Sequence, residues 1–222
     1  GYDAHSQSGN SFNFATGSEI ATGWRAKLSD NDVCWKLDLP YDFPFYGSSY
    51  SNVWVSIHGV LSFDDYFDNW WPSDGSLSVS KIISAMWANV DTSSGDIYVT
   101  SSAEAVTVRW SGVYWNTSDP VSFSATLYPN GNVRLSYGAG NVRGGWIGVS
   151  SGNGLPFYTL AAECNTESTT NSMHNANDIV FTPWVPTPEW LDLSYEGVLS
   201  GTPTDTETLA IHVNVMDEGV TE

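Results

Sequence analysis

Short stretches in which apolar and polar residues alternate recur along the chain from residue 53 to residue 150. In the first stretch Val53, Val55 and Ile57 are apolar, and the alternation resumes after Gly59. Alternation with a period of two is typical of β-strands that bury one face. The same pattern is found at Ile97/Val99, Val106/Val108/Trp110, Val121/Phe123/Ala125/Leu127, Val133/Leu135/Tyr137 and Ile147/Val149.

Turn-forming residues separate these stretches. Segments 93–96, 129–132 and 143–145 each contain glycine, and the first two add Asp or Asn. Gly and Asn adopt the positive φ angles that tight hairpins require. Many short strands at this spacing predict an all-β fold, an antiparallel β-sandwich or jelly roll. Residues 81–90 fit either a helix or a buried strand.

The composition of the sequence changes near residue 183. Three prolines, Pro183, Pro186 and Pro188, mark a connector there because proline cannot donate a ladder hydrogen bond. We therefore predict a β-sandwich domain at residues 1–183 and a short β segment at 184–222. The second segment is too short to fold alone. It would dock on the main domain, pair with another chain or belong to a larger module.

The charge of the chain argues against two classes of partner. The sequence has 25 acidic and 7 basic residues, a net charge of −18. Such a surface repels nucleic acid phosphates and anionic lipid head groups. No apolar run approaches the roughly 20 residues of a membrane span. The acidic, Ser/Thr/Asn/Gly-rich composition predicts an extracellular or cell-surface protein.

Cys34 and Cys164 are the two cysteines of the chain. In an oxidising compartment they would form a disulfide that closes a very long loop. In the chain-entropy model such a bond contributes about 4–5 kcal/mol. The alternative is two buried thiols.

The sequence offers no constellation for catalysis. His5, His58, His174 and His212 are scattered, and no serine lies in a Gly-x-Ser-x-Gly motif. We therefore expect a protein that is not an enzyme. The alternative is an enzyme of an unrecognised type.

Calcium is the metal that the sequence favours. Closely spaced Asp and Asn side chains supply the oxygen ligands that calcium prefers, and they occur in four acidic turns, at 29–32, 64–69, 91–96 and 216–219. We favour Asp91 and Asp96, which a glycine-containing turn would bring together, and Asp217 comes next. The alternative is that each turn is only a solvated acidic surface.

Two adjacent tryptophans, Trp70 and Trp71, lie in a stretch rich in Asp, Asn, Pro and Gly, where no periodic pattern predicts a buried face. Exposed rings beside carboxylates typify a sugar-binding platform, because a pyranose stacks on a ring while oxygens accept its hydroxyl protons. We therefore predict that Tyr66, Asp68, Trp70 and Trp71 bind a glycan or an extracellular protein. The alternative is that at least one ring plugs the underside of the loop.

Several motifs follow one another in the order found in a known family. They are "YDFPFYGSSYSNVWVSIHGVLSF" (41–63), "AMWANVDTSSGDIYV" (85–99), "FSATLYPNGNVRLSYG" (123–138) and "GGWIGVSSGNG" (144–154). Over roughly residues 40 to 155 the chain resembles nidogen-like (NIDO-type) extracellular domains. His58 and Asn89 depart from the family pattern, which tends to have Asn and Asp there. The resemblance implies an extracellular adhesion or matrix role without catalysis.

The tail "PEWLDLSYEGVLSGTPTDTETLAIHVNVMDEG" (188–219) resembles the second half of the Ig-like and cadherin-like repeats of bacterial surface proteins. The first half of such a repeat is not recognisable upstream. This leaves an alternative function open. The chain would be a structural subunit of an extracellular fibre or surface layer that self-associates by β-strand complementation through its C-terminal segment.

Overall fold

The computed structural model describes residues 1–13, 18–19, 34–67, 69, 76, 79–152, 158–159, 172–184, 191–193 and 199–202. The chain divides into two compact units, Gly1–Pro183 and Trp184–Glu222. In the second unit, β14 (Leu191–Leu193) and β15 (Leu199–Gly201) form an antiparallel pair. The remaining strands belong to the first unit.

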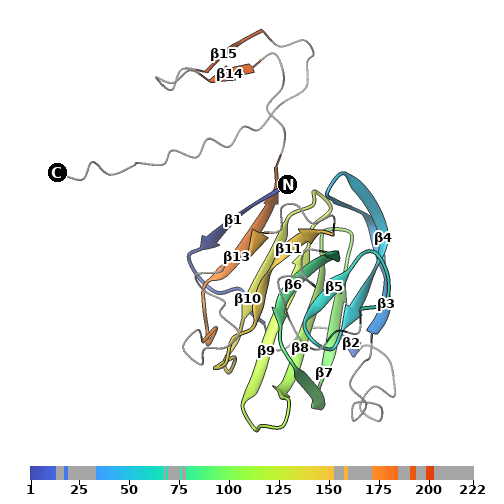
Figure 1. The fold of residues 1–222 in the computed structure, drawn as a ribbon, viewed down its shortest axis with the longest axis vertical. Helices are drawn as coiled ribbons and strands as arrows, with labels where there is room; N and C mark the ends of the chain where they lie inside the picture. Colours follow the sequence, from blue (N-terminus) through green and yellow to red (C-terminus); the bar gives the residue numbers. More distant parts are fainter. Residues whose placement is uncertain are drawn as a thin grey trace, which may run out of the picture. The chain divides into compact units, whose positions relative to one another are not determined.

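One sheet of the first unit has seven strands, all paired antiparallel. Figure 1 shows its first and last strands in sequence, β1 and β13, side by side at one edge. In spatial order the strands are β1 (Tyr2–Gln7), β13 (Asp178–Pro183), β10 (Val133–Tyr137), β9 (Pro120–Leu127), β8 (Val106–Tyr114), β7 (Val90–Ser101) and β2 (Ser18–Glu19).

The other sheet has six strands, also antiparallel. In order they are β12 (Tyr158–Thr159), β11 (Trp146–Ser151), β6 (Lys81–Trp87), β5 (Val60–Ser62), β4 (Ser48–Ser56) and β3 (Cys34–Phe45). The two sheets form a sandwich, so the predicted all-β class is confirmed. The ambiguous segment 81–90 contains β6 and the start of β7 and forms no helix.

The predicted turn at 93–96 is wrong, because these residues lie within β7. The strand leaves regular pairing with β8 between Asp91 and Asp96 and then resumes it. Glycines allow this irregularity, since a Cβ on Gly95 would overlap the carbonyl group of Ser111. The irregularity is therefore a bulge and does not reverse the chain.

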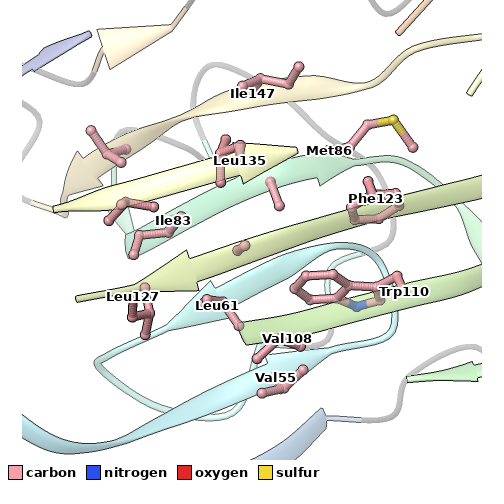
Figure 2. Close-up of a cluster of buried hydrophobic side chains, with 14 of the residues drawn as sticks. Val55, Leu61, Ile83, Met86, Val108, Trp110, Phe123, Leu127, Leu135 and Ile147 are labelled. Atoms are coloured by element: carbon pink, nitrogen blue, oxygen red, sulfur yellow. The ribbon is translucent and has the colours of Figure 1, made fainter. Parts of the chain in front are cut away.

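The core consists of the side chains that the two sheets turn toward each other (Figure 2). Trp110 of β8 stacks on Phe123 of β9, with ring centroids 5.1 Å apart. Two buried hydrogen bonds cross between the sheets. Trp110 Nε1 donates to the Ser56 carbonyl oxygen at 2.8 Å, and the Tyr137 hydroxyl donates to the Ala85 carbonyl oxygen at 2.8 Å.

The segment that follows β1 crosses the seven-stranded sheet on its outer face. Both carboxylate oxygens of Asp178, which is 2% exposed, accept a hydrogen bond from the Ser11 backbone N–H at 3.1 Å. The Asn10 side chain donates to the carbonyl oxygens of Tyr137 and Ala176. Residues 9–13 therefore cover the outer face near β13 and β10.

A tight two-residue turn, Tyr46–Gly47, joins β3 to β4. Tyr46 and Gly47 have φ angles of 46° and 80°, as a two-residue type I′ hairpin requires. A non-glycine residue rarely adopts this conformation. Here ring contacts hold Tyr46, at centroid distances of 4.8 Å to Phe45 and 5.2 Å to Tyr2. Burial also raises the pKa of the Tyr46 phenol to about 12.

The turn between β4 and β5 packs against the centre of the core. Gly59 has a φ of 79°, and its carbonyl oxygen accepts a hydrogen bond from Ala85 N–H at 2.9 Å. A Cβ at Gly59 would lie 2.5 Å from the Met86 carbonyl oxygen and 2.8 Å from Phe123 Cζ. The glycine is required both by its φ angle and by the lack of space.

We predict that Gly59→Ala is much more destabilising than Gly47→Ala. Both glycines have positive φ, but a Cβ at Gly47 would have nothing within 4 Å. Gly47→Ala should therefore cost only the conformational strain of about 1–2 kcal/mol. Gly59→Ala should cost roughly 1–3 kcal/mol more, because the core is overpacked. Denaturant unfolding measures both values, and equal costs would contradict the close packing at Gly59.

We also predict that stability falls as the pH rises from 10 to 12. The unfolded Tyr46 phenol loses its proton near the ordinary pKa of 10.0, whereas the folded protein keeps it up to about pH 12. The unfolded state thus binds fewer protons in this range, which lowers the free energy of unfolding. Tyr46→Phe should flatten the decline of the melting temperature. Some decline should remain, since burial also raises the pKa values of Tyr2 and Tyr41. Equal slopes for both proteins would refute the assignment to Tyr46.

Candidate functional site

The connection between β5 and β6 lies against the outer face of the six-stranded sheet. Leu61 and Ile83 point into the core, so Val60 and Ile82 point outward, and both are fully buried. Phe67 of the connection packs edge-on against Trp87, with centroids 5.1 Å apart, and joins Val60 and Ile82 in a second apolar cluster.

Two hydrogen bonds fix this connection. Trp87 Nε1 donates to the Asn69 carbonyl oxygen at 2.9 Å, and the Phe67 N–H donates to Cys34 Sγ at 3.4 Å. Phe67 therefore anchors the connection to the outer face of the sheet.

Next to this anchor, Tyr66 is exposed. Its side chain is 44% exposed, and its ring lies 6.0 Å from that of half-buried Trp54 in an edge-to-face arrangement. Lys36 is paired with Trp54 across β3 and β4, and its Nζ is 6.0 Å from the Trp54 ring centroid. The next pair on this face is Asp38 and Asn52. We call these five residues the aromatic platform.

The aromatic platform has the chemistry of a surface that binds polar ligands with apolar faces. Tyr66 and Trp54 supply rings on which a sugar ring can stack. Asp38 and Asn52 supply oxygen acceptors for hydroxyl protons, and Lys36 and Asn52 supply donors.

Of the residues predicted to bind a ligand, Tyr66 lies on this surface. Asp68, Trp70 and Trp71 lie outside the described residues, so their role stays a prediction. Trp54, Lys36, Asp38 and Asn52 were not predicted as ligand contacts from the sequence. The alternation in β4 already places Trp54 on the face opposite Val53 and Val55, which was the available signal.

Asp91 and Asp96 lie on the outer face of the seven-stranded sheet. Their partners on β8 are Val113 and Ser111, two residues apart, which corresponds to about 7 Å along a strand. Asp91 Oδ1 accepts a hydrogen bond from Ser93 N–H, and Asp96 Oδ1 accepts one from Ile97 N–H, both at 2.8 Å. Asp96 is buried, at 6% exposure.

Within the described ranges there is no group of three or more His, Cys, Asp or Glu side chains placed to hold a metal. Asp217 lies outside those ranges. Calcium binding stays a prediction.

Cys34 packs against the cluster formed by Phe67, Trp87, Val60 and Ile82. Cys164 lies outside the described residues, so the disulfide also stays a prediction.

His58 has a structural position in the turn between β4 and β5. It is buried, its Nδ1 accepts a hydrogen bond from Val90 N–H at 3.3 Å, and its carbonyl oxygen accepts one from Ala88 N–H at 3.3 Å. His58 thereby ties the turn to the corner between β6 and β7.

The fold and the aromatic platform define an antiparallel two-sheet β-sandwich with a candidate binding face on its smaller sheet. A family model described as NIDO related matches residues 1–187, and the chain belongs to this family. The match confirms the nidogen-type resemblance and covers the whole first unit. Membership in this family indicates a module of the extracellular type. The Ig-like resemblance of the tail stays a prediction.

No curated protein and no solved structure matches the chain. In the part of the chain that the structure describes, no helix combines the length and the apolarity needed to cross a membrane.

For the acidic bulge we predict that calcium raises the melting temperature of the protein. An ion bound only by the folded state stabilises it by mass action. The melting temperature in millimolar calcium should be a few degrees higher than in chelator. The double variant Asp91→Asn/Asp96→Asn should show no such difference. Asp38→Asn, which changes a carboxylate on the other sheet, should keep it. Identical wild-type curves in calcium and chelator would show that the bulge is only a solvated acidic surface.

Proposed function

We propose that this protein is a non-enzymatic extracellular binding module that recognises a glycan through the aromatic platform. The observation that carries the proposal is the exposed ring of Tyr66, held edge-on to Trp54. A contact surface of this kind favours binding because its rings are already ordered before the ligand arrives.

The position of Tyr66 is fixed by its neighbours in the chain. Phe67 is buried against Trp87, and the Asp65 carboxylate accepts the Tyr66 N–H at 2.7 Å. A ligand therefore meets a ring whose backbone is held on both sides. Trp70 and Trp71 follow in the same connection and would extend the surface.

The charge of the protein favours an uncharged sugar at this surface. With a net charge of −18 the protein repels anionic glycans at long range. Neutral pyranoses present apolar C–H faces to aromatic rings and need only hydrogen bonds from polar neighbours.

A second candidate is a structural subunit that assembles by strand complementation through the C-terminal segment. The antiparallel pair β14 and β15 favours it, because a two-stranded sheet is marginally stable in water without further strands. The β3 edge of the sandwich is unsuited to such pairing. It carries Lys36, Asp38, Pro40 and Asp42, which are residue types that block edge-to-edge association.

We predict that Tyr66→Ala weakens glycan binding at least roughly 10-fold, as expected for loss of a central aromatic contact. Its stability should change little, since the side chain is exposed. A glycan array would first identify the ligand, and calorimetry would then compare the variants. The double variant Trp70→Ala/Trp71→Ala should also bind the same ligand more weakly.

The control is Trp115→Ala. The exposed fraction of Trp115, 40%, is similar to that of Tyr66, 44%. Trp115 follows β8 of the other sheet, so its replacement should leave the affinity for the glycan unchanged. Equal losses in the two variants, or no loss with Tyr66→Ala, would refute the platform. The second candidate would be supported if the full chain formed oligomers that depend on concentration while a variant without residues 184–222 stayed monomeric.

A further inference from the structure

The turn between β8 and β9 contains an acceptor sequence for N-glycosylation. Asn116, Thr117 and Ser118 form an Asn-x-Ser/Thr triplet with no proline at the middle position. Among all asparagines of the chain, Asn116 alone is followed by Ser or Thr two positions later. So short a triplet also occurs by chance, and therefore its surroundings in the fold decide whether it can be modified.

The middle residue of the triplet holds the turn together. The Thr117 hydroxyl donates to the Tyr114 carbonyl oxygen at 2.8 Å and accepts a hydrogen bond from the Asp119 N–H at 3.2 Å. The Tyr114 N–H donates to the Asp119 carbonyl oxygen at 3.0 Å, and the Asp119 carboxylate pairs with Arg143 at 2.7 Å. These contacts fix the turn without the side chains of the two outer residues of the triplet.

The two outer residues of the triplet, Asn116 and Ser118, are exposed. Neither the Asn116 amide nor the Ser118 hydroxyl forms a hydrogen bond with any residue that the structure describes. Asn116 has a φ of 56°, a left-handed conformation that asparagine adopts more readily than most residues. The amide nitrogen of Asn116 can therefore carry a substituent without breaking a contact of the turn.

The turn lies at the end of the seven-stranded sheet that is remote from the ends of the first unit. Val113 pairs with Pro120 beside the turn, whereas Leu127 pairs with Val133 at the opposite end of the sheet. The register places the end of β13 and the beginning of β1 at that opposite end. A bulky group on the turn is therefore far from the points where the chain enters and leaves the first unit.

An exposed tryptophan directly precedes the triplet. Trp115 is 40% exposed, and its backbone N–H donates to the Asn89 carbonyl oxygen at 2.9 Å. A pyranose can cover such a ring with its apolar face, which removes apolar surface from water. A sugar linked to Asn116 would be attached one residue away from this ring.

We propose that Asn116 is a site of N-glycosylation and that the first sugar of its oligosaccharide packs on Trp115. The extracellular type of the module favours this modification, which takes place in the secretory pathway. The proposal is independent of the aromatic platform, which lies on the other sheet.

The donor in this reaction is an oligosaccharide joined to a lipid through pyrophosphate, and a membrane-bound transferase catalyses the transfer. Asn116 Nδ2 forms a bond to the anomeric carbon of the first sugar. The bond between that carbon and the pyrophosphate oxygen breaks, so the lipid pyrophosphate is the leaving group. The amide nitrogen gives up one of its two protons and stays neutral.

The test is mass spectrometry of the full chain after secretion from cultured mammalian cells. The peptide that contains Asn116 should carry an oligosaccharide, and peptide-N-glycosidase should remove it and leave Asp at this position. Ser118→Ala and Asn116→Asp should both lack the oligosaccharide, because each destroys the triplet. Thr117→Val is the matched control. It keeps the triplet and should keep the oligosaccharide, although it should melt at a lower temperature because the turn loses its hydroxyl contacts.

Melting temperatures test the contact with Trp115. The glycosylated wild type should melt roughly 2–4 °C above the same protein after treatment with peptide-N-glycosidase. In Trp115→Ala most of this difference should disappear, because the sugar no longer has a ring to cover. The treated wild type and Asn116→Asp have the same sequence and should melt at the same temperature.

The glycosylation site is refuted if Asn116 is recovered unmodified from secreted, folded wild type, or if Ser118→Ala retains an oligosaccharide at Asn116. The contact with Trp115 is overturned if glycosylation raises the melting temperatures of the wild type and of Trp115→Ala equally. If Ser118→Ala is not secreted, the same comparison is made with Asn116→Asp, which keeps a residue suited to the left-handed conformation.

Discussion

The close approach of the two sheets at Gly59 is the constraint on which the rest of the sandwich depends. At this point the β4–β5 turn of one sheet touches Phe123 of the other, and no side chain fits between them. Phe123 in turn stacks on Trp110, whose indole N–H bonds back to Ser56 at the end of β4. The turn, the two stacked rings and the hydrogen bond thus form one continuous set of contacts between the sheets, and this set fixes their separation. Dense interiors transmit such local constraints because they contain few voids.

Both sheets also have covered outer faces, and this explains where chemistry is concentrated. On the six-stranded sheet Phe67 seals an apolar cluster, and Tyr66 is left exposed beside it. On the seven-stranded sheet the polar face itself is buried, including Arg109 and Asp178. The Asp178 carboxylate accepts a hydrogen bond from the Ser11 backbone N–H, whereas Arg109 lies beside the ring of Tyr98. One outer face therefore exposes an apolar ring to water, whereas the other withdraws charged groups from it.

Much of this architecture could be predicted from local pattern. Alternation identified the central strands, and the Asn-Gly motif at 130–131 marked a hairpin, because strand period and turn conformation are set by near neighbours. The bulge between Asp91 and Asp96 was predicted as a turn, because Ser, Gly and Asp are common in both. Gly112 of β8 lies close to it, since a Cβ there would lie 2.3 Å from the Asp91 carbonyl oxygen. The neighbours of Tyr66 and the burial of Arg109 on an outer face could not be predicted. They depend on which segments cover the outer faces, and such long-range packing leaves no periodic signal.

The pairing of β1 with β13 has a mechanical consequence. Tyr2 is opposite Pro183, so the beginning and the end of the first unit leave the sheet at the same end of two neighbouring antiparallel strands. Tension applied across these two points would load the rungs of the ladder one after another, as in opening a zipper, and would not shear them together. The Tyr2 hydroxyl, bonded to the Gly131 carbonyl oxygen at 3.1 Å, fastens the first rung. Held between neighbours in a longer fibre or on a surface, such a unit would yield gradually under load and extend while its core strands stayed paired.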